Sequence, residues 1–143
     1  MKLFSTLILA VLLTASCASS FRGLKVRVQS PSMSEAFRKL SLALRADDYE
    51  VETLDSEAFQ VVTQWREMKK EEENEAEKKS GDPMLVRIAL RLEPRGTLYD
   101  VFLTPFVQSG RNDEMIPESG HPLFQKWQRI LNKILVREQR EED

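Results

Sequence analysis

The chain has 143 residues, with 21 basic and 23 acidic side chains, one histidine and one cysteine. This near balance of charge gives no electrostatic reason to expect nucleic-acid binding, which needs a clustered basic face. One histidine and one cysteine also argue against a transition-metal site, and we expect no metal and no other cofactor. The length suits a single domain with one modest core.

The first twenty residues have the pattern of a bacterial export signal. Lys2 precedes an apolar run from Leu3 to Leu13, which is too short to span a bilayer because a spanning helix needs about 20 apolar residues. Small residues then lead into the only cysteine. The stretch Leu13-Thr14-Ala15-Ser16-Cys17 resembles a bacterial lipobox, with Thr14 where leucine is more usual. The alternative is a plain signal peptide that is cleaved near a cysteine.

The lipobox resemblance implies that residues 1–16 are removed and that Cys17 is acylated, with palmitate among the usual chains. Two or three acyl chains anchor a protein firmly to a membrane where one does not. In enterobacterial lipoproteins an aspartate after the cysteine retains the protein in the inner membrane, and Ala18 stands there. The resemblance therefore implies the outer membrane, with the protein facing the periplasm. Residues 17–23 form a lipidated tether of at most about 25 Å, so the domain is expected close to the membrane.

A single domain is predicted over residues 24–137, beginning with a strand. Residues 24–29 alternate apolar and polar side chains, which is typical of a half-buried strand. Ser32 and Glu35 fit a capping box for a helix over residues 33–45. We expect the apolar stripe of this helix to pack on the protein's own sheet rather than in a partner's groove.

A hairpin follows the turn at Asp47-Asp48. Residues 49–53 form its first strand and residues 59–65 its second, joined by the turn at residues 55–57. The second strand is predicted to place four side chains on one face: Phe59, Val61, Thr63 and Trp65. We interpret Trp65 as a core residue rather than as a platform for a ligand.

Residues 67–83 (EMKKEEENEAEKKSGDP) are almost entirely charged or polar. Such a segment lacks the apolar surface that would order it, and residues 80–83 end it with turn chemistry. We expect a mobile, solvated loop between two strands, in which helix forms transiently at most. An acidic patch that binds a basic partner or a divalent ion is the alternative.

Two longer strands come next. In residues 85–93 one face carries Val86, Ile88, Leu90 and Leu92. Residues 98–107 form the other strand, in which both faces are partly apolar. Either a bulge changes its register, or another part of the molecule covers Phe102 and Phe106. Pro105 indicates a sheet edge or a bulge late in this strand.

The chain closes with a loop and a helix. Residues 108–120 are rich in turn residues, with Met115-Ile116 as a small apolar island. The helix is predicted over residues 122–137, capped by Ser119 or His121, and residues 138–143 form a charged tail. We interpret His121 as a capping or solvated residue, because the sequence offers no partners for a metal site or a pH switch.

This order of elements predicts an α+β fold. Four strands linked by turns make an antiparallel sheet, and the first strand is expected to join its edge. Each helix has one apolar stripe, so both helices need the same face of the sheet. The predicted architecture is therefore two-layered, with the order β-α-β-β-β-β-α, and helix-grip-like.

The arrangement resembles the helix-grip domains of the NlpB/DapX lipoproteins, the C component of the outer-membrane barrel-assembly machinery. The matching features are the lipobox cysteine, the helix Ser34-Glu35-Ala36-Phe37 with Leu40 and Ala43-Leu44, the strand Tyr49-Glu50-Val51, and the hairpin end Val61-Val62-Thr63-Gln64-Trp65. The likeness spans about residues 24–136. It implies an accessory role in assembling outer-membrane proteins, although this chain would hold one such domain rather than two.

Three functions are considered, and a non-enzymatic accessory or scaffold subunit of an envelope complex is preferred. Its candidate partner contacts are Phe102, Phe106, Met115 and Ile116. A periplasmic carrier of lipid or another small molecule, held between helix and sheet, is the alternative. An enzyme is disfavoured: Asp100, Asp113 and Glu114 are available carboxylates, but none stands beside a histidine or a serine motif that would supply a base or nucleophile.

Overall fold

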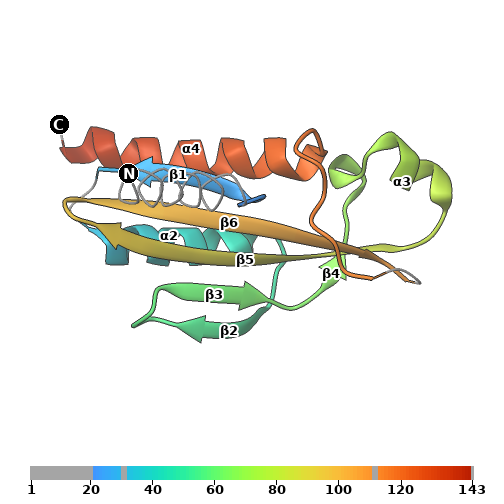
Figure 1. Ribbon diagram of the computed structural model, residues 1–143, viewed down its shortest axis with the longest axis horizontal. Helices are drawn as coiled ribbons and strands as arrows, with labels where there is room; N and C mark the ends of the chain where they lie inside the picture. Colours follow the sequence, from blue (N-terminus) through green and yellow to red (C-terminus); the bar gives the residue numbers. More distant parts are fainter. Residues whose placement is uncertain (1–20, 30–31, 111–112, 143) are drawn as a thin grey trace, which may run out of the picture.

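The computed structural model describes residues 21–29, 32–110 and 113–142 (Figure 1). The strands are β1 (Leu24–Val28), β2 (Val51–Asp55), β3 (Gln60–Thr63), β4 (Arg66–Glu67), β5 (Met84–Arg95) and β6 (Leu98–Ser109). The helices are α2 (Met33–Ala46), the short 3₁₀ helix η1 (Lys70–Glu72), α3 (Glu75–Ser80) and α4 (Pro122–Glu142). The last helix thus continues through most of the predicted charged tail.

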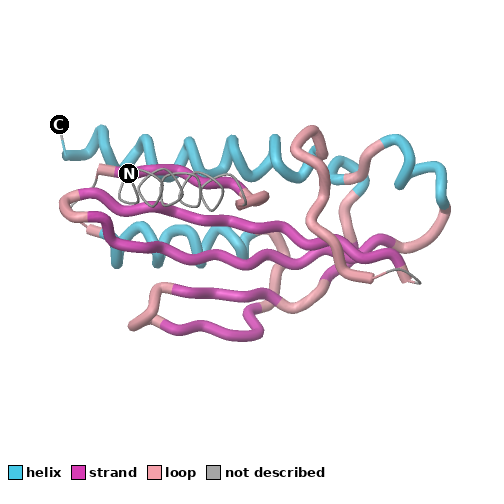
Figure 2. Tube along the Cα trace, viewed as in Figure 1, coloured by secondary structure: helices cyan, strands magenta, loops and turns pink. Residues whose placement is uncertain are grey.

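The strands form one sheet in the order β1-β6-β5-β3-β2, and β4 pairs with β5 beyond the end of β3. All of these pairings are antiparallel. Figure 2 shows the long β5–β6 hairpin running the length of the molecule. The two-layer α+β prediction is confirmed, and β1 joins the edge beside β6 as expected.

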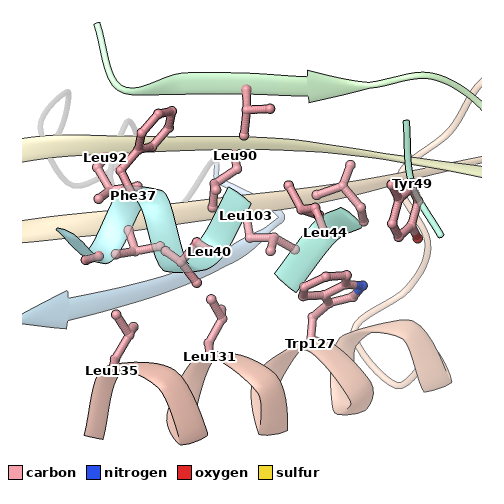
Figure 3. Packing of buried hydrophobic residues seen from close by; sticks show 14 of the residues in the cluster. Phe37, Leu40, Leu44, Tyr49, Leu90, Leu92, Leu103, Trp127, Leu131 and Leu135 are labelled. Carbon is pink, nitrogen blue, oxygen red and sulfur yellow. The ribbon is translucent and has the colours of Figure 1, made fainter. Parts of the chain in front are cut away.

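The core lies between the sheet and the two long helices (Figure 3). It contains Phe37, Leu40 and Leu44 from α2, Leu90 and Leu92 from β5, Leu103 from β6, and Trp127, Leu131 and Leu135 from α4. Helical spacing on α2 and α4 and strand alternation on β5 and β6 direct these side chains to one place. The predicted apolar stripes are therefore core surfaces, as expected.

The long hairpin settles the ambiguity over Phe102 and Phe106. Its register runs from Met84↔Ser109 to Arg95↔Leu98 without a shift, so no bulge turns the two phenylalanines inward. Pro105 lies past the last β1–β6 pair, Leu24↔Leu103. The Pro105 nitrogen points to the edge of β6 that β1 no longer covers. The N–H of Val107, two residues later, points to the same edge, where it donates to the Met115 carbonyl oxygen. The predicted edge position of Pro105 is confirmed.

The segment 67–83 is not the structureless loop that its composition predicted. It contains η1 and α3, and the side chains of Met68 and Glu72 are buried. A reciprocal capping box begins α3: Glu77 N–H donates to Asn74 Oδ1 at 2.8 Å, and Asn74 N–H donates to Glu77 Oε1 at 2.9 Å. The segment is held by charged partners from distant elements, which composition does not reveal.

The core assignment of Trp65 is also wrong. Val61 and Thr63 of β3 face the core and are fully buried. The chain leaves β3 after Thr63 and re-enters the sheet at Arg66, so strand alternation breaks between them. Trp65 consequently lies on the opposite face of the sheet, where the guanidinium of Arg87 stacks on its ring.

Candidate functional site

The face of the sheet turned away from α2 and α4 is the candidate functional surface, and we call it the open face. Ile88 and Leu90 of β5 point into the core, so Arg87, Ala89 and Arg91 point the other way. The same alternation turns Phe102, Thr104 and Phe106 of β6 outward. In Figure 1 the strands β5 and β6 cross in front of α2, with this face toward the reader.

One row of the open face is built around Phe102. Lys25 of β1 pairs with Phe102, and Phe102 pairs with Arg91 of β5. The Lys25 ammonium lies 5.6 Å and the Arg91 guanidinium 4.4 Å from the centre of the Phe102 ring. Phe21 meets the same ring edge-on, with 5.1 Å between centroids. The aromatic ring thus has cations on two sides and is only 8% exposed.

A second row is built around Arg87. Its guanidinium lies 4.9 Å from the centre of the Trp65 ring and 5.3 Å from that of Phe106, its cross-strand partner. Glu114, from the loop after β6, forms an ion pair with the same guanidinium. Arg87 is thereby held between two aromatic rings.

Small side chains separate the two rows. Thr104 pairs with Ala89, and Ala89 pairs with Val62 of β3. Gly23 lies close against this row. A Cβ added at Gly23 would lie 2.7 Å from the Leu103 carbonyl oxygen and 2.8 Å from Thr104 Oγ1. The close approach places Phe21 over β6.

A buried carboxylate ends the open face near the turn of the hairpin. Asp100 is fully buried and lies 3.0 Å from Nε of Arg27 and 2.9 Å from Nε of Arg95. The two guanidinium groups cover and neutralise it. Asp100 is therefore occupied in ion pairs rather than poised as a catalytic base.

The part of the open face on β1, β6 and β5 carries a local excess of positive charge. Its outward basic side chains on β1 and β5 are Lys25, Arg27, Arg87, Arg91 and Arg95. The acidic side chains beside them are Glu93, Asp100 and Glu114, and each forms an ion pair with an arginine of this group. Asp55 and Glu67 lie on the same face on β2 and β4 and balance the charge there. The whole chain has a formal charge of −2, so this basic excess is local.

The predicted partner contacts do not form one surface. Phe102 and Phe106 lie on the open face. Met115 and Ile116 follow β6 in a separate loop, where Met115 is 57% exposed and bridges to Val107. Cys17 lies outside the described residues. Asp113 is exposed and Glu114 is paired with Arg87.

Sequence reasoning missed the cations that accompany the two phenylalanines. The alternation in residues 85–93 already placed Arg87 and Arg91 opposite the core, and that was the available signal. Their stacking on Phe102, Phe106 and Trp65 depends on strand order, which no local pattern reports.

A second polar cluster joins α2, η1 and α4. Arg66 binds Glu72 through two parallel hydrogen bonds of 2.8 and 2.7 Å, and it also reaches Asp47 at 3.0 Å. Lys126 of α4 donates to both carboxylates at 2.8 Å. Lys69 adds a bond of 3.0 Å to Asp47. The cluster links the C-terminal end of α2 to the first turns of α4.

The electrostatics of this cluster are those of a structural network. Burial alone would raise the pKa of Glu72, but hydrogen bonds from Arg66 and Lys126 outweigh it and lower the pKa to about 2. Burial likewise opposes the charge on Arg66, yet its bonds to Glu72 raise its pKa above the usual range. Each carboxylate is matched by a cation, so no group is left free for proton transfer.

His121 has partners that the sequence did not reveal. Its Nδ1 accepts the Leu123 N–H at 3.1 Å, which confirms the predicted capping of the last helix. Since Nδ1 accepts, Nε2 carries the hydrogen and donates to Glu77 Oε1 at 2.7 Å. The side chain is buried rather than solvated. Beside it lies a cavity of about 510 Å³ that Met84 and Met115 help to line.

Other hollows lie at the surface of the helix layer. A groove of about 510 Å³ runs between α2 and α4, lined in part by Leu42, Ile130 and Ile134. Within the described part of the chain, no three histidine, cysteine or acidic side chains gather closely enough to hold a metal ion. Across those same residues, no helix combines the length and apolar character needed to cross a membrane.

Comparisons with known proteins add little. No protein-family model matches the chain, and no curated protein sequence matches it. A solved structure of a DUF4468 family protein from Bacteroides ovatus ATCC 8483 is similar over 78% of each chain, with 12% identity and a TM-score of 0.37. Similarity at that level assigns no function, and the resemblance to NlpB/DapX lipoproteins stays a prediction.

Proposed function

We propose that this protein is a lipid-anchored lipoprotein of the bacterial outer membrane, facing the periplasm, where its domain serves as a non-enzymatic accessory or scaffold subunit of an envelope complex. The observation that carries the proposal is the lipobox-like stretch Leu13–Cys17, with the first strand beginning at Leu24, the seventh residue after Cys17. A tether this short keeps the domain within about 25 Å of its anchor.

The packing favours a scaffold over a carrier. Leu40, Leu44 and Trp127 occupy the space between helices and sheet in which a helix-grip carrier would hold its ligand, and each is at most 1% exposed. Of the carboxylates considered for an enzyme, Asp100 is engaged with Arg27 and Arg95, and Glu114 is engaged with Arg87. Assembly of outer-membrane proteins is the specific role that the family resemblance suggests.

Acylation is tested by metabolic labelling. Cells that express the tagged chain are grown with radiolabelled palmitate, and a Cys17→Ser variant is compared with Ser19→Ala, which leaves the cysteine intact. We expect label and membrane retention for the natural chain and for Ser19→Ala, and neither for Cys17→Ser. An unlabelled natural chain would overturn the lipoprotein assignment.

The scaffold role is tested by in-cell cross-linking and affinity capture from membranes. Recovery of barrel-assembly components would support the assembly role, and recovery of another stable complex would support a scaffold elsewhere in the envelope. Met115→Glu is expected to weaken capture without lowering thermal stability, because that side chain is largely exposed. Capture of nothing above background, together with a ligand retained in native mass spectrometry, would favour the carrier alternative.

A further inference from the structure

We propose that the open face docks onto the anionic headgroup surface of the membrane, so that the domain lies flat on the bilayer with its helices turned away. This inference rests on the proposed acylation of Cys17. It adds that one defined face of the domain, and not only the lipid, contacts the membrane.

The first argument is reach. Phe21 packs edge-on against Phe102 at 5.1 Å, so the chain enters the domain over the open face. Only four peptide units separate Phe21 from Cys17, a span of at most about 14 Å. An acylated Cys17 therefore holds this face, rather than the helix layer, next to the headgroups.

The second argument is chemistry. Aromatic side chains prefer the boundary between water and hydrocarbon, and basic side chains are attracted to anionic lipids. The open face interleaves the two kinds in two rows, Lys25–Phe102–Arg91 and Phe106–Arg87–Trp65. Stacking on the rings and ion pairs with Glu114 and Glu93 hold Arg87 and Arg91 in place, which lowers the entropy cost of presenting their remaining N–H groups to phosphates.

The third argument is charge complementarity. Over β1, β6 and β5, the basic side chains Lys25, Arg27, Arg87, Arg91 and Arg95 outnumber the acidic Glu93, Asp100 and Glu114, whereas the chain as a whole is acidic. A second copy that placed its own β1–β6–β5 surface against this one would bring two basic surfaces together, which is unfavourable. An anionic membrane matches the charge of this face and lies within reach of it.

Trp65 supplies a direct measurement. The chain has two tryptophans, and Trp127 is 1% exposed in the core, so Trp127 provides an unquenched baseline. The lipidated protein is reconstituted into vesicles of phosphatidylethanolamine and phosphatidylglycerol that contain brominated lipid, or into neutral phosphatidylcholine vesicles with the same quencher. We expect quenching in the anionic vesicles and little in the neutral ones. A Trp65→Phe variant should show none.

A charge variant tests the cause. The open-face variant replaces three basic residues by glutamine: Lys25, Arg87 and Arg91. The matched control replaces three basic residues of the helices by glutamine: Arg45, Arg129 and Lys133. Each basic side chain near an anionic surface contributes about a fivefold preference. The open-face variant should therefore lose most of the quenching, and the helix variant should retain it. Circular dichroism confirms that both variants are folded.

The outcomes separate this inference from the proposed function. If mass spectrometry finds acylated Cys17 but Trp65 is not quenched on anionic vesicles, the docking inference is wrong and the lipoprotein assignment stands. Equal quenching on anionic and neutral vesicles, unchanged in the charge variant, would also overturn it. If Cys17 carries no lipid, the proposed function itself fails.

Discussion

Gly23 fixes the path by which the chain enters the domain. A Cβ at this position would lie 2.7 Å from the Leu103 carbonyl oxygen and 2.8 Å from both the Phe21 ring and Thr104 Oγ1. The carbonyl belongs to the β6 backbone, which cannot move without disturbing the β1–β6 pairing. Glycine is therefore required by space at Gly23 rather than by backbone conformation.

We expect Gly23→Ala to destabilise the domain by about 1–3 kcal/mol, the usual cost of forcing a methyl group into a packed site. Thermal unfolding followed by circular dichroism measures the change. Gly110→Ala is the matched control, because a Cβ there meets no atom within 4 Å. Equal melting temperatures for the two variants would show that the close approach at Gly23 does not affect the free energy of unfolding.

Glu72 makes the stability of the domain depend on acid. Its pKa is about 2 in the folded protein, against an ordinary value of 4.5. Between those values the unfolded chain binds a proton that the folded chain does not, so acidification favours unfolding. We expect about 3 kcal/mol of stability to be present above pH 5 and to be lost progressively as the pH falls toward about 2.

Urea unfolding at several pH values checks this dependence. A Glu72→Gln variant should be less stable near neutral pH, because Arg66 and Lys126 lose a buried counter-charge, but it should respond less steeply to acid. The same dependence on pH in both proteins would assign the acid response to other carboxylates.

At the scale of elements, His121 fastens the start of α4 to α3. It caps α4 through Leu123 and donates to Glu77, which is itself part of the cap of α3. We expect His121→Ala to cost about 1–2 kcal/mol and to speed amide hydrogen exchange across α3, with β5 and β6 unaffected. Ser119→Ala, at the other predicted cap, should change neither quantity. Unaltered exchange in α3 would contradict the role of His121 in holding it.

Local patterns predicted the regular elements well. Alternation identified the core face of β5, and helical spacing identified Phe37, Leu40 and Leu44 on α2. These patterns succeed because the spacing of apolar residues within a helix or strand determines which of its faces packs on the core.

The failures have long-range causes. In residues 67–83, η1 is held because Asp47 and Lys126, far away in the sequence, complete the charge network around Glu72. The helix α3 is held by the hydrogen bond between His121 and Glu77. Trp65 was misplaced because the break in β3 after Thr63 reverses the alternation. The open face was only half predicted, since Phe102 and Phe106 stood out by hydrophobicity whereas the stacking of Arg87 and Arg91 depends on strand order.

At the scale of the whole molecule, docking of the open face would give the domain a fixed orientation. Leu42 on α2 is 50% exposed on the helix side, and Gln60 of β3 is exposed on the open face beside Arg91. Cysteines introduced by Leu42→Cys and Gln60→Cys should therefore differ in lipidated protein on anionic vesicles. A water-soluble maleimide should label Leu42→Cys fully and Gln60→Cys slowly. Release by detergent should equalise the two rates, and equal rates before detergent would exclude a fixed orientation.

The pairing of β1 with β6 bears on how the chain would fold after the proposed export. Leu24 pairs with Leu103, so the first strand of the domain can pair only when the final strand, β6, is available. Until β6 arrives, β1 has no partner, and contacts this distant in sequence form late and slowly. In the proposed export pathway, Cys17 would therefore precede a strand that is still unpaired, which would give processing enzymes time to reach the cysteine before β1 joins the sheet.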